Sequence, residues 1–221
     1  EAEVGRLCGL GASAEVFTVD DVMTRYPSLS TCAAPLDWES DHECADGAAF
    51  LFEGRAGYID PMDALGDLLA ACTAAGASVS FGSEVVSVSK SGGRVTGVRT
   101  AGGDSVSATL VVNASGPWCN RLNALAGVEH RWTFAPTRIQ TLYRPWSDGE
   151  IPITLDVATG VYARPERSSG MVWVGSVREE DEREAIDDPD DFARSPSVAF
   201  RDMTLASFQH RFPAAAPKGP V

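Results

Sequence analysis

The sequence has no apolar run close to the roughly 20 residues that a helix needs to cross a membrane. It also lacks a basic opening segment of the kind that begins a secretory signal, so we expect a cytoplasmic protein that does not enter a membrane. Basic residues are few, with 18 Lys and Arg against 31 Asp and Glu and a net charge of −13. This balance argues against a nucleic-acid partner, because few cations are available to neutralise phosphates.

Cysteine and histidine show no metal-binding spacing. The five cysteines are scattered and none forms a Cys-x-x-Cys pair. The three histidines, His42, His130 and His210, lie far apart, and a metal site would need them to converge from three segments. The sequence therefore predicts neither a disulfide framework nor a metal site.

The composition is that of a folded protein with a real core. Of the 221 residues, 44% are hydrophobic and 22% are charged, which fits one large domain or two small ones. Capping and breaker residues predict helices that begin after Thr18 and after Asp60. Together with two further apolar patterns, the predicted helices cover 18–26, 60–75, 116–126 and 197–212.

Short strands fill most of the remaining sequence. Glycine pairs at 92–93 and 102–103 are typical of hairpin turns between strands. The strands predicted around these turns are 78–81, 84–90, 94–100 and 105–113. A second group covers 47–54 and four segments within 137–177, and the acidic run at 178–191 is expected to be a solvated loop.

The stretch "TLVVNASGPWCNRL" (109–122) raises a question about function. It begins as a buried strand with Leu110, Val111 and Val112 and then breaks into the small residues at 113–117. A strand that only has to end needs one breaker, so several small side chains indicate that another group comes close to the backbone there. The alternative is a plain strand-to-helix turn.

Several segments taken together resemble the FAD-dependent oxidoreductases of the D-amino-acid oxidase, sarcosine oxidase and dimethylglycine dehydrogenase family. They cover more than half of the chain in family order and with family spacing. They are "GYIDP" (57–61), "SEVVSVSKSGGRVTGVRTAGG" (83–103), "LVVNASGPWCNRLNALAG" (110–127) and, more weakly, "APTRIQTLYRP" (135–145) and "GVYARPERSSGMVWVGS" (160–176).

The resemblance implies a non-covalent FAD. By resemblance, the adenine would contact the backbone of Val85, and the cofactor would be lined by Asn113, Ala114, Ser115 and Gly116. The family's opening strand with its G-x-G-x-x-G turn has no counterpart, because "GLGASA" (9–14) follows no buried strand. The closing FAD segment is missing as well. We therefore expect an internal part of a longer flavoenzyme, which alone binds FAD weakly, turns over nothing and self-associates through exposed surfaces.

The resemblance also implies oxidation of a C–N bond in an amino acid or a secondary or tertiary amine by hydride transfer to the flavin. A substrate carboxylate needs a cation, preferably a guanidinium. Arg164 alternates with Tyr162 on one strand face, which makes the two a candidate carboxylate-binding pair. The other candidates for substrate binding are Arg138, Gln140 and Tyr58. The alternative for Arg164 is an ion pair with a surface acid, and no catalytic residue is assigned.

The expected fold class is α/β (α+β), with a partial FAD-binding layer and a mostly antiparallel substrate-domain sheet with flanking helices. The FAD-side segment is 57–127, and the substrate side comprises 1–56 and 128–221. The alternative function is a non-catalytic β-rich module that binds a small molecule or a protein. The sequence identifies neither the amine nor the acceptor that reoxidises the flavin.

Overall fold

The computed structural model describes residues 2–36, 41–45, 49–129, 131, 134–146, 149–166, 168–182 and 184–215. The chain forms two compact units. Unit 1 comprises Glu1–Tyr58, Arg138–Glu184 and Ala193–Val221, and unit 2 comprises Ile59–Thr137 and Ala185–Phe192. Within the described ranges, no helix is both long and apolar enough to cross a bilayer.

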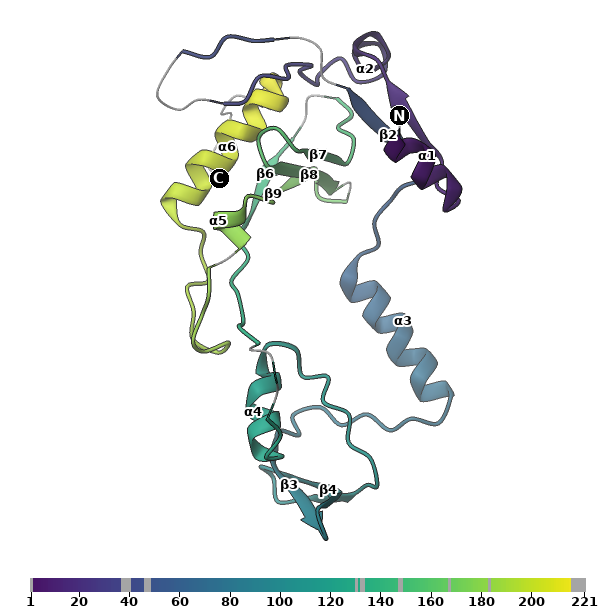
Figure 1. Ribbon diagram of the computed structural model, residues 1–221, viewed down its shortest axis with the longest axis vertical. Helices are drawn as coiled ribbons and strands as arrows, with labels where there is room; N and C mark the ends of the chain where they lie inside the picture. The colour runs from purple at the N-terminus through teal and green to yellow at the C-terminus, as the bar shows by residue number, and fades with distance from the viewer. Residues whose placement is uncertain are drawn as a thin grey trace. The chain divides into compact units, whose positions relative to one another are not determined.

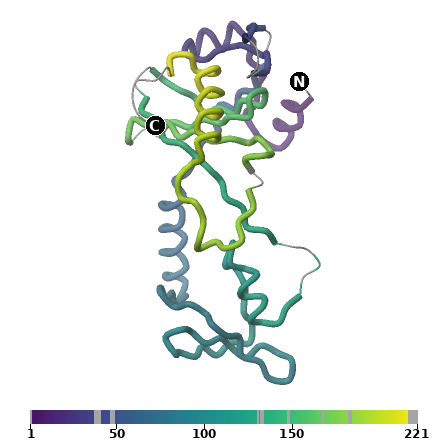
Figure 2. Tube along the Cα trace, turned by 90° about the vertical axis from the view of Figure 1, so that its left-hand side faces the viewer, coloured from purple at the N-terminus to yellow at the C-terminus, as the bar shows by residue number. Residues whose placement is uncertain are grey.

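Unit 1 is built on a four-stranded antiparallel sheet in the order β6-β9-β8-β7. The helix α6 (Val198–Arg211) packs against this sheet, as Figures 1 and 2 show. The helix predicted at 197–212 and the strands predicted within 137–177 are confirmed. The strands are β6 (Thr141–Pro145), β7 (Thr154–Asp156), β8 (Val161–Glu166) and β9 (Met171–Ser176).

Alternation along the strands gives this sheet two different faces. One face buries Val161, Ala163, Val172 and Val174 in the core that Phe208 of α6 completes. The other face carries aromatic and charged side chains that are only partly buried. This second face is described below as the open face, and its members include Tyr143, Tyr162, Arg164 and Trp173.

The N-terminal part of unit 1 contains a separate two-stranded sheet. Here β1 (Ala14–Phe17) pairs with β2 (Phe50–Glu53), so the prediction that the 47–54 strand joins the sheet of residues 137–177 is wrong. α2 (Val19–Arg25) begins after Thr18 as predicted, and Thr18 and Asp21 form a capping box there. The "GLGASA" segment follows α1 (Ala2–Gly9), a helix without buried residues, which confirms that no buried strand precedes it.

Unit 2 contains α3 (Pro61–Ala74), which is capped by Asp60 as predicted. Its three-stranded antiparallel sheet has the order β3-β4-β5, and α4 packs beside β3 (Figure 2). Gly92 and Gly93 have φ values of 56° and 77°, which fits their place in the predicted hairpin turn. The remaining elements of this unit are β3 (Val85–Ser91), β4 (Arg94–Thr100), β5 (Ser105–Ser107), η1 (Gly116–Trp118) and α4 (Cys119–Leu125).

Two strand predictions in unit 2 are wrong. Residues 78–81 and 108–113 form no strand, and Leu110 and Val112 are 76% and 75% exposed rather than buried. A strand that is apolar on both faces needs paired neighbours and covering layers. The described residues of unit 2 supply neither at this segment. In the acidic run, the structure adds the short helix α5 (Glu179–Glu182) to the expected loop.

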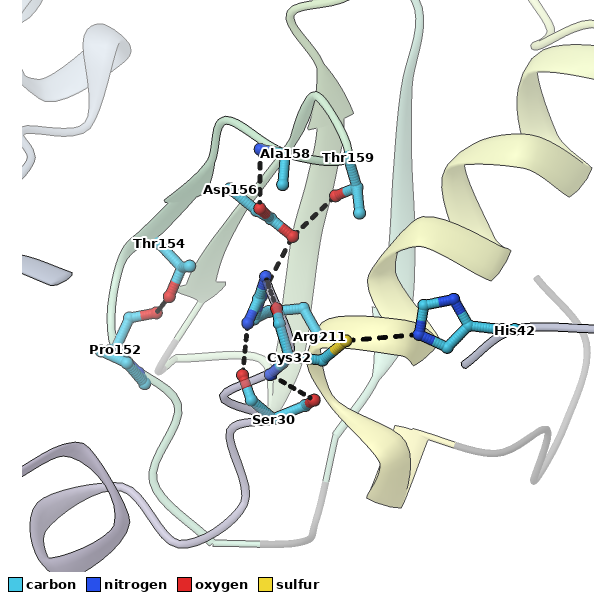
Figure 3. A network of polar contacts seen from close by, with 9 residues as sticks. All are labelled: Ser30, Cys32, His42, Pro152, Thr154, Asp156, Ala158, Thr159 and Arg211. Atoms are coloured by element: carbon cyan, nitrogen blue, oxygen red, sulfur yellow. Dashed lines mark hydrogen bonds and ion pairs between the residues drawn. The ribbon is translucent and has the colours of Figure 1, made fainter. Parts of the chain in front are cut away.

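A buried ion pair connects the sheet of unit 1 to α6 (Figure 3). Arg211 Nε donates to Asp156 Oδ2 over 3.0 Å, and the two side chains are only 5% and 4% exposed. The hydroxyl of Thr159 and the backbone N–H of Ala158 donate to the same carboxylate. The remaining guanidinium nitrogens donate to the carbonyls of Ser30 and Cys32, so Arg211 also holds the segment that follows α2.

Candidate functional site

The open face of the unit 1 sheet is centred on Arg164. Its guanidinium carbon lies 4.3 Å from the ring centre of Tyr58 and 4.3 Å from the ring centre of Trp173. Trp173 is the direct partner of Arg164 across the β8–β9 pair, which explains the contact. The Tyr58 hydroxyl donates to the Pro165 carbonyl over 2.9 Å and so holds its ring beside Arg164. The cation is therefore held by two aromatic faces.

Two donors in this cluster are buried without an acceptor. They are Arg164 Nε and Trp173 Nε1, which have no hydrogen-bond partner among the described residues. Both groups can only donate, and burial of an unsatisfied donor is costly. An oxygen acceptor that also carries negative charge would satisfy the chemistry of the two groups.

Glu166 supplies the one acid that pairs with Arg164 within the described residues. Arg164 Nη2 lies 2.8 Å from Glu166 Oε2, and the Arg164 side chain is 12% exposed. The alternative of an ion pair is thus present in the structure, although Glu166 lies on the same strand face rather than on a distant surface. The pair leaves Nε without a partner among the described residues.

Tyr162 and Tyr143 extend the aromatic part of the open face. Tyr162 meets Trp173 edge-on, with ring centres 6.4 Å apart, and Tyr143 stacks on Trp173 at 6.3 Å. A Cβ at Gly175 would lie 2.2 Å from the Tyr162 ring, so only glycine leaves room for this tyrosine. A pocket of about 350 Å³ adjoins the cluster and shares Pro165 and Glu166 with it.

Within the described part of the chain, the hydrogen bonds of Arg138 and Gln140 go to residues outside this cluster. The guanidinium of Arg138 is buried and donates to the carboxylate of Glu184 and to the carbonyls of Ala193 and Ser195. Gln140 donates to Glu184 over 3.1 Å and accepts from the backbone N–H of Ser197 over 2.7 Å. These contacts favour structural roles for both residues, and their contact with substrate stays a prediction.

The small-residue turn of unit 2 is organised by Asn113. Its amide nitrogen donates to the Cys119 carbonyl and the Asn123 side chain, and its oxygen accepts from the Ser115 backbone and hydroxyl. The side chain is thus occupied in holding the turn. Gly116 has a φ of 53° and no atom within 4 Å of a Cβ built on it. The backbone is therefore open to the close approach that a dinucleotide needs.

Val85 lies at the start of β3, which is one of the two edge strands of the described three-stranded sheet. Its partner on β4 is Thr100, and a register irregularity separates it from Ser87. An edge strand presents backbone groups on its unpaired side. The environment of Val85 thus fits a backbone contact with adenine. The open backbone of the turn at 113–116 also fits FAD, and both contacts stay predictions.

Comparison with known proteins gives the family. The sequence model of the family described as FAD dependent oxidoreductase matches residues 3–220. The chain belongs to the FAD-dependent oxidoreductase family. This family takes FAD as its cofactor, and its members are enzymes, so the alternative of a non-catalytic binding module is not favoured. No curated relative matches the sequence.

Solved structures show the same fold. L-proline dehydrogenase from P. horikoshii is 21% identical with a TM-score of 0.73, and 94% of this chain covers 50% of that one. Glycine oxidase from Bacillus cereus ATCC 14579 is 18% identical with a TM-score of 0.66, with 96% and 53% covered. NikD, an amino acid oxidase essential for nikkomycin biosynthesis, is 18% identical with a TM-score of 0.62, with 97% and 53% covered. The chain thus spans about half the length of these proteins.

Sequence reasoning missed Trp173 and Glu166. Glu166 follows from the strand pattern, since it shares the face of Tyr162 and Arg164 by simple alternation. The contact of Trp173 with Arg164 depends on the register between β8 and β9, which the sequence does not specify. The structure also brings two of the three histidines together with one cysteine, contrary to the expectation that they stay apart. His130 lies outside the described residues.

Proposed function

We propose that this chain supplies the substrate-binding sheet and part of the cofactor-binding layer of a FAD-dependent oxidoreductase that oxidises the C–N bond of an amino acid or of a secondary or tertiary amine. The observation that carries the proposal is Arg164, held between two aromatic rings with its Nε lacking an acceptor. A substrate carboxylate is an acceptor of the right charge and geometry for a guanidinium.

The residues of unit 1 have separate roles in this proposal. Arg164 binds the carboxylate, and Trp173 Nε1 donates a further hydrogen bond to the substrate. Tyr58 and Trp173 keep the guanidinium in place, while Tyr162 and Tyr143 provide apolar surface for the amine substituents. Glu166 competes for the guanidinium until a substrate carboxylate replaces it.

The residues of unit 2 hold the cofactor. The backbone of Val85 would contact the adenine, and the turn of Asn113, Ala114, Ser115 and Gly116 would let the dinucleotide approach closely. FAD would supply the acceptor for a hydride from the carbon next to the substrate nitrogen. The protein's part is to orient that carbon and to keep competing groups away. We also infer that the isolated chain holds FAD weakly and non-covalently, in line with the exposed apolar segment around Val112.

The proposal predicts which compounds reduce the flavin. In a flavin-loaded protein that contains the whole of this chain, N-methylglycine or another small amino acid should bleach the flavin absorbance under anaerobic conditions. The primary amide of the same compound should do so at least about 10-fold less efficiently, because it lacks the charge that Arg164 recognises. Equal rates for acid and amide would contradict the carboxylate site, and reduction by neither compound would contradict this substrate class.

A further inference from the structure

Three potential metal ligands meet at the last turn of α6 in unit 1. They are Cys32, His42 and His210, and their ligand atoms all lie within 4.8 Å of one another. Cys32 is buried and both histidines are half-buried. The ligands come from three places in the sequence, namely the segment after α2, the following loop and the last turn of α6.

The distances within this cluster suit a tetrahedral ion. Zinc bonds of about 2.0–2.3 Å to nitrogen and sulfur, at tetrahedral angles, place ligand atoms roughly 3.3–3.7 Å apart. Cys32 Sγ lies 3.3 Å from His42 Nε2 (Figure 3). The rings of His42 and His210 meet edge-on, with their centres 4.5 Å apart. Small side-chain movements would bring all three atoms to one ion.

His210 provides a second, independent observation. Its Nε2 is buried and has no hydrogen-bond partner among the described residues. A buried imidazole nitrogen without a partner is costly, and coordination of a metal removes that cost. Neither the aromatic core nor the site on the open face uses this nitrogen.

The cluster is held in place by the ion pair of Arg211, the residue next to His210. Arg211 Nη2 donates to the Cys32 carbonyl over 3.0 Å, and the Ser30 backbone N–H donates to the Arg211 carbonyl over 2.7 Å. The backbone N–H of Ala33 donates to the Ala45 carbonyl over 2.8 Å, which ties the loop carrying His42 to the segment of Cys32. Such outer contacts orient metal ligands and fix their geometry.

Neighbouring groups shift the pKa of two of these side chains. Burial raises the pKa of the Cys32 thiol, but hydrogen bonds from the Ala45 and Ala34 backbone and from His42 and Cys44 outweigh this and lower the pKa to about 7. Burial, with the nearby His42 and Arg211, lowers the pKa of His210. A thiolate and a neutral imidazole are the forms that bind zinc.

We propose that Cys32, His42 and His210 bind a zinc ion that fastens the loop around residues 41–45 to α6. One thiolate and two imidazoles are ligands that zinc accepts, and the fourth position is open to water or to the neighbouring Cys44. On binding, the Cys32 thiol releases its proton and the sulfur donates an electron pair to the ion. The site lies on the α6 side of the sheet, so its role is structural and does not depend on the proposed oxidation.

Zinc binding is tested on the 221-residue chain, purified with a reductant, stripped with EDTA and gel-filtered after addition of zinc sulfate. We expect about one zinc ion per chain by elemental analysis, together with a higher melting temperature. His42→Asn should weaken zinc binding by at least about 100-fold in a chelator competition, since loss of even an outer partner costs 10–100-fold. Cys72→Ser, an exposed cysteine on α3, is the matched control and should bind like the parent.

Cobalt provides a readout that does not depend on stability. Co²⁺ added to the stripped chain should give a thiolate-to-metal charge-transfer band that is lost in Cys32→Ser and kept in Cys72→Ser. His42 lies in a loop outside the buried core, so its variant keeps the test valid even where Cys32→Ser folds poorly. Failure of the parent chain to retain zinc or to show this band would overturn the proposal. So would a stable Cys32–Cys44 disulfide in place of metal binding.

Discussion

Replacement of Arg164 by glutamine is expected to lower kcat/KM for flavin reduction by an amino acid about 100-fold, measured in a flavin-loaded protein that contains this chain. The substrate carboxylate loses a charge-assisted partner in a largely desolvated site, and loss of such a partner costs roughly 2–5 kcal/mol. Arg164→Lys keeps the charge but loses the planar stacking between Tyr58 and Trp173. Its kcat/KM should therefore fall between that of the parent and that of Arg164→Gln.

Two controls separate substrate binding from structure at this position. Glu166→Gln removes the competing acid and should raise the apparent affinity for the amino acid, an effect that a purely structural ion pair would not produce. Arg201→Gln removes an exposed arginine on α6 that pairs with Asp202 and should leave kcat/KM unchanged. A loss in Arg164→Gln that is equal for the amino acid and its amide would contradict carboxylate recognition.

Replacement of Asp156 by alanine is expected to lower the free energy of unfolding by about 3–5 kcal/mol, because it leaves the buried Arg211 charge without its partner. Chemical denaturation of the chain measures the loss. Asp202→Ala breaks an exposed ion pair on α6, the helix that carries Arg211, and should cost less than about 1 kcal/mol. The double change Asp156→Ala with Arg211→Met should recover part of the loss, and a single Asp156 variant as stable as the parent would contradict this role.

The Asp156 carboxyl also makes the stability of unit 1 depend on pH in the acid range. Burial alone would raise the pKa of Asp156, but hydrogen bonds from Arg211 and Thr159 and the Arg211 charge outweigh burial and hold the pKa below its ordinary value. Stabilisation by this group is therefore complete above the unfolded pKa of about 3.9 and is lost as pH falls through the folded value. Relative to Asp156→Ala, the parent chain should lose its advantage only in that acid range.

Local sequence signals predicted the elements of the fold well. The capping of α2 by Thr18 and of α3 by Asp60 follows from side chains adjacent to the helix start. The shared face of Tyr162 and Arg164 follows from the two-residue repeat of a strand. Each of these features depends on residues close together in the sequence, and the structure agrees with all of them.

The features that sequence reasoning missed depend on distant partners. The segment at 108–113 has the composition of a buried strand, but the unit lacks the neighbours that would pair with it, so Val112 is exposed. The prediction for β2 failed because pairing depends on which strand lies beside it rather than on its own pattern. His42 and His210 meet only because a loop returns to the last turn of α6, and no residue spacing encodes that return.

The central claim is that the open face of the unit 1 sheet binds a substrate carboxylate through Arg164. The indole N–H resonance of Trp173, assigned with Trp173→Phe, reports on this face directly, because the group is buried and lacks an acceptor among the described residues. Titration with N-methylglycine should shift it in a saturable way, and the shift should be absent with the amide and in Arg164→Gln. No shift with the acid, or equal shifts with acid and amide, would contradict the account.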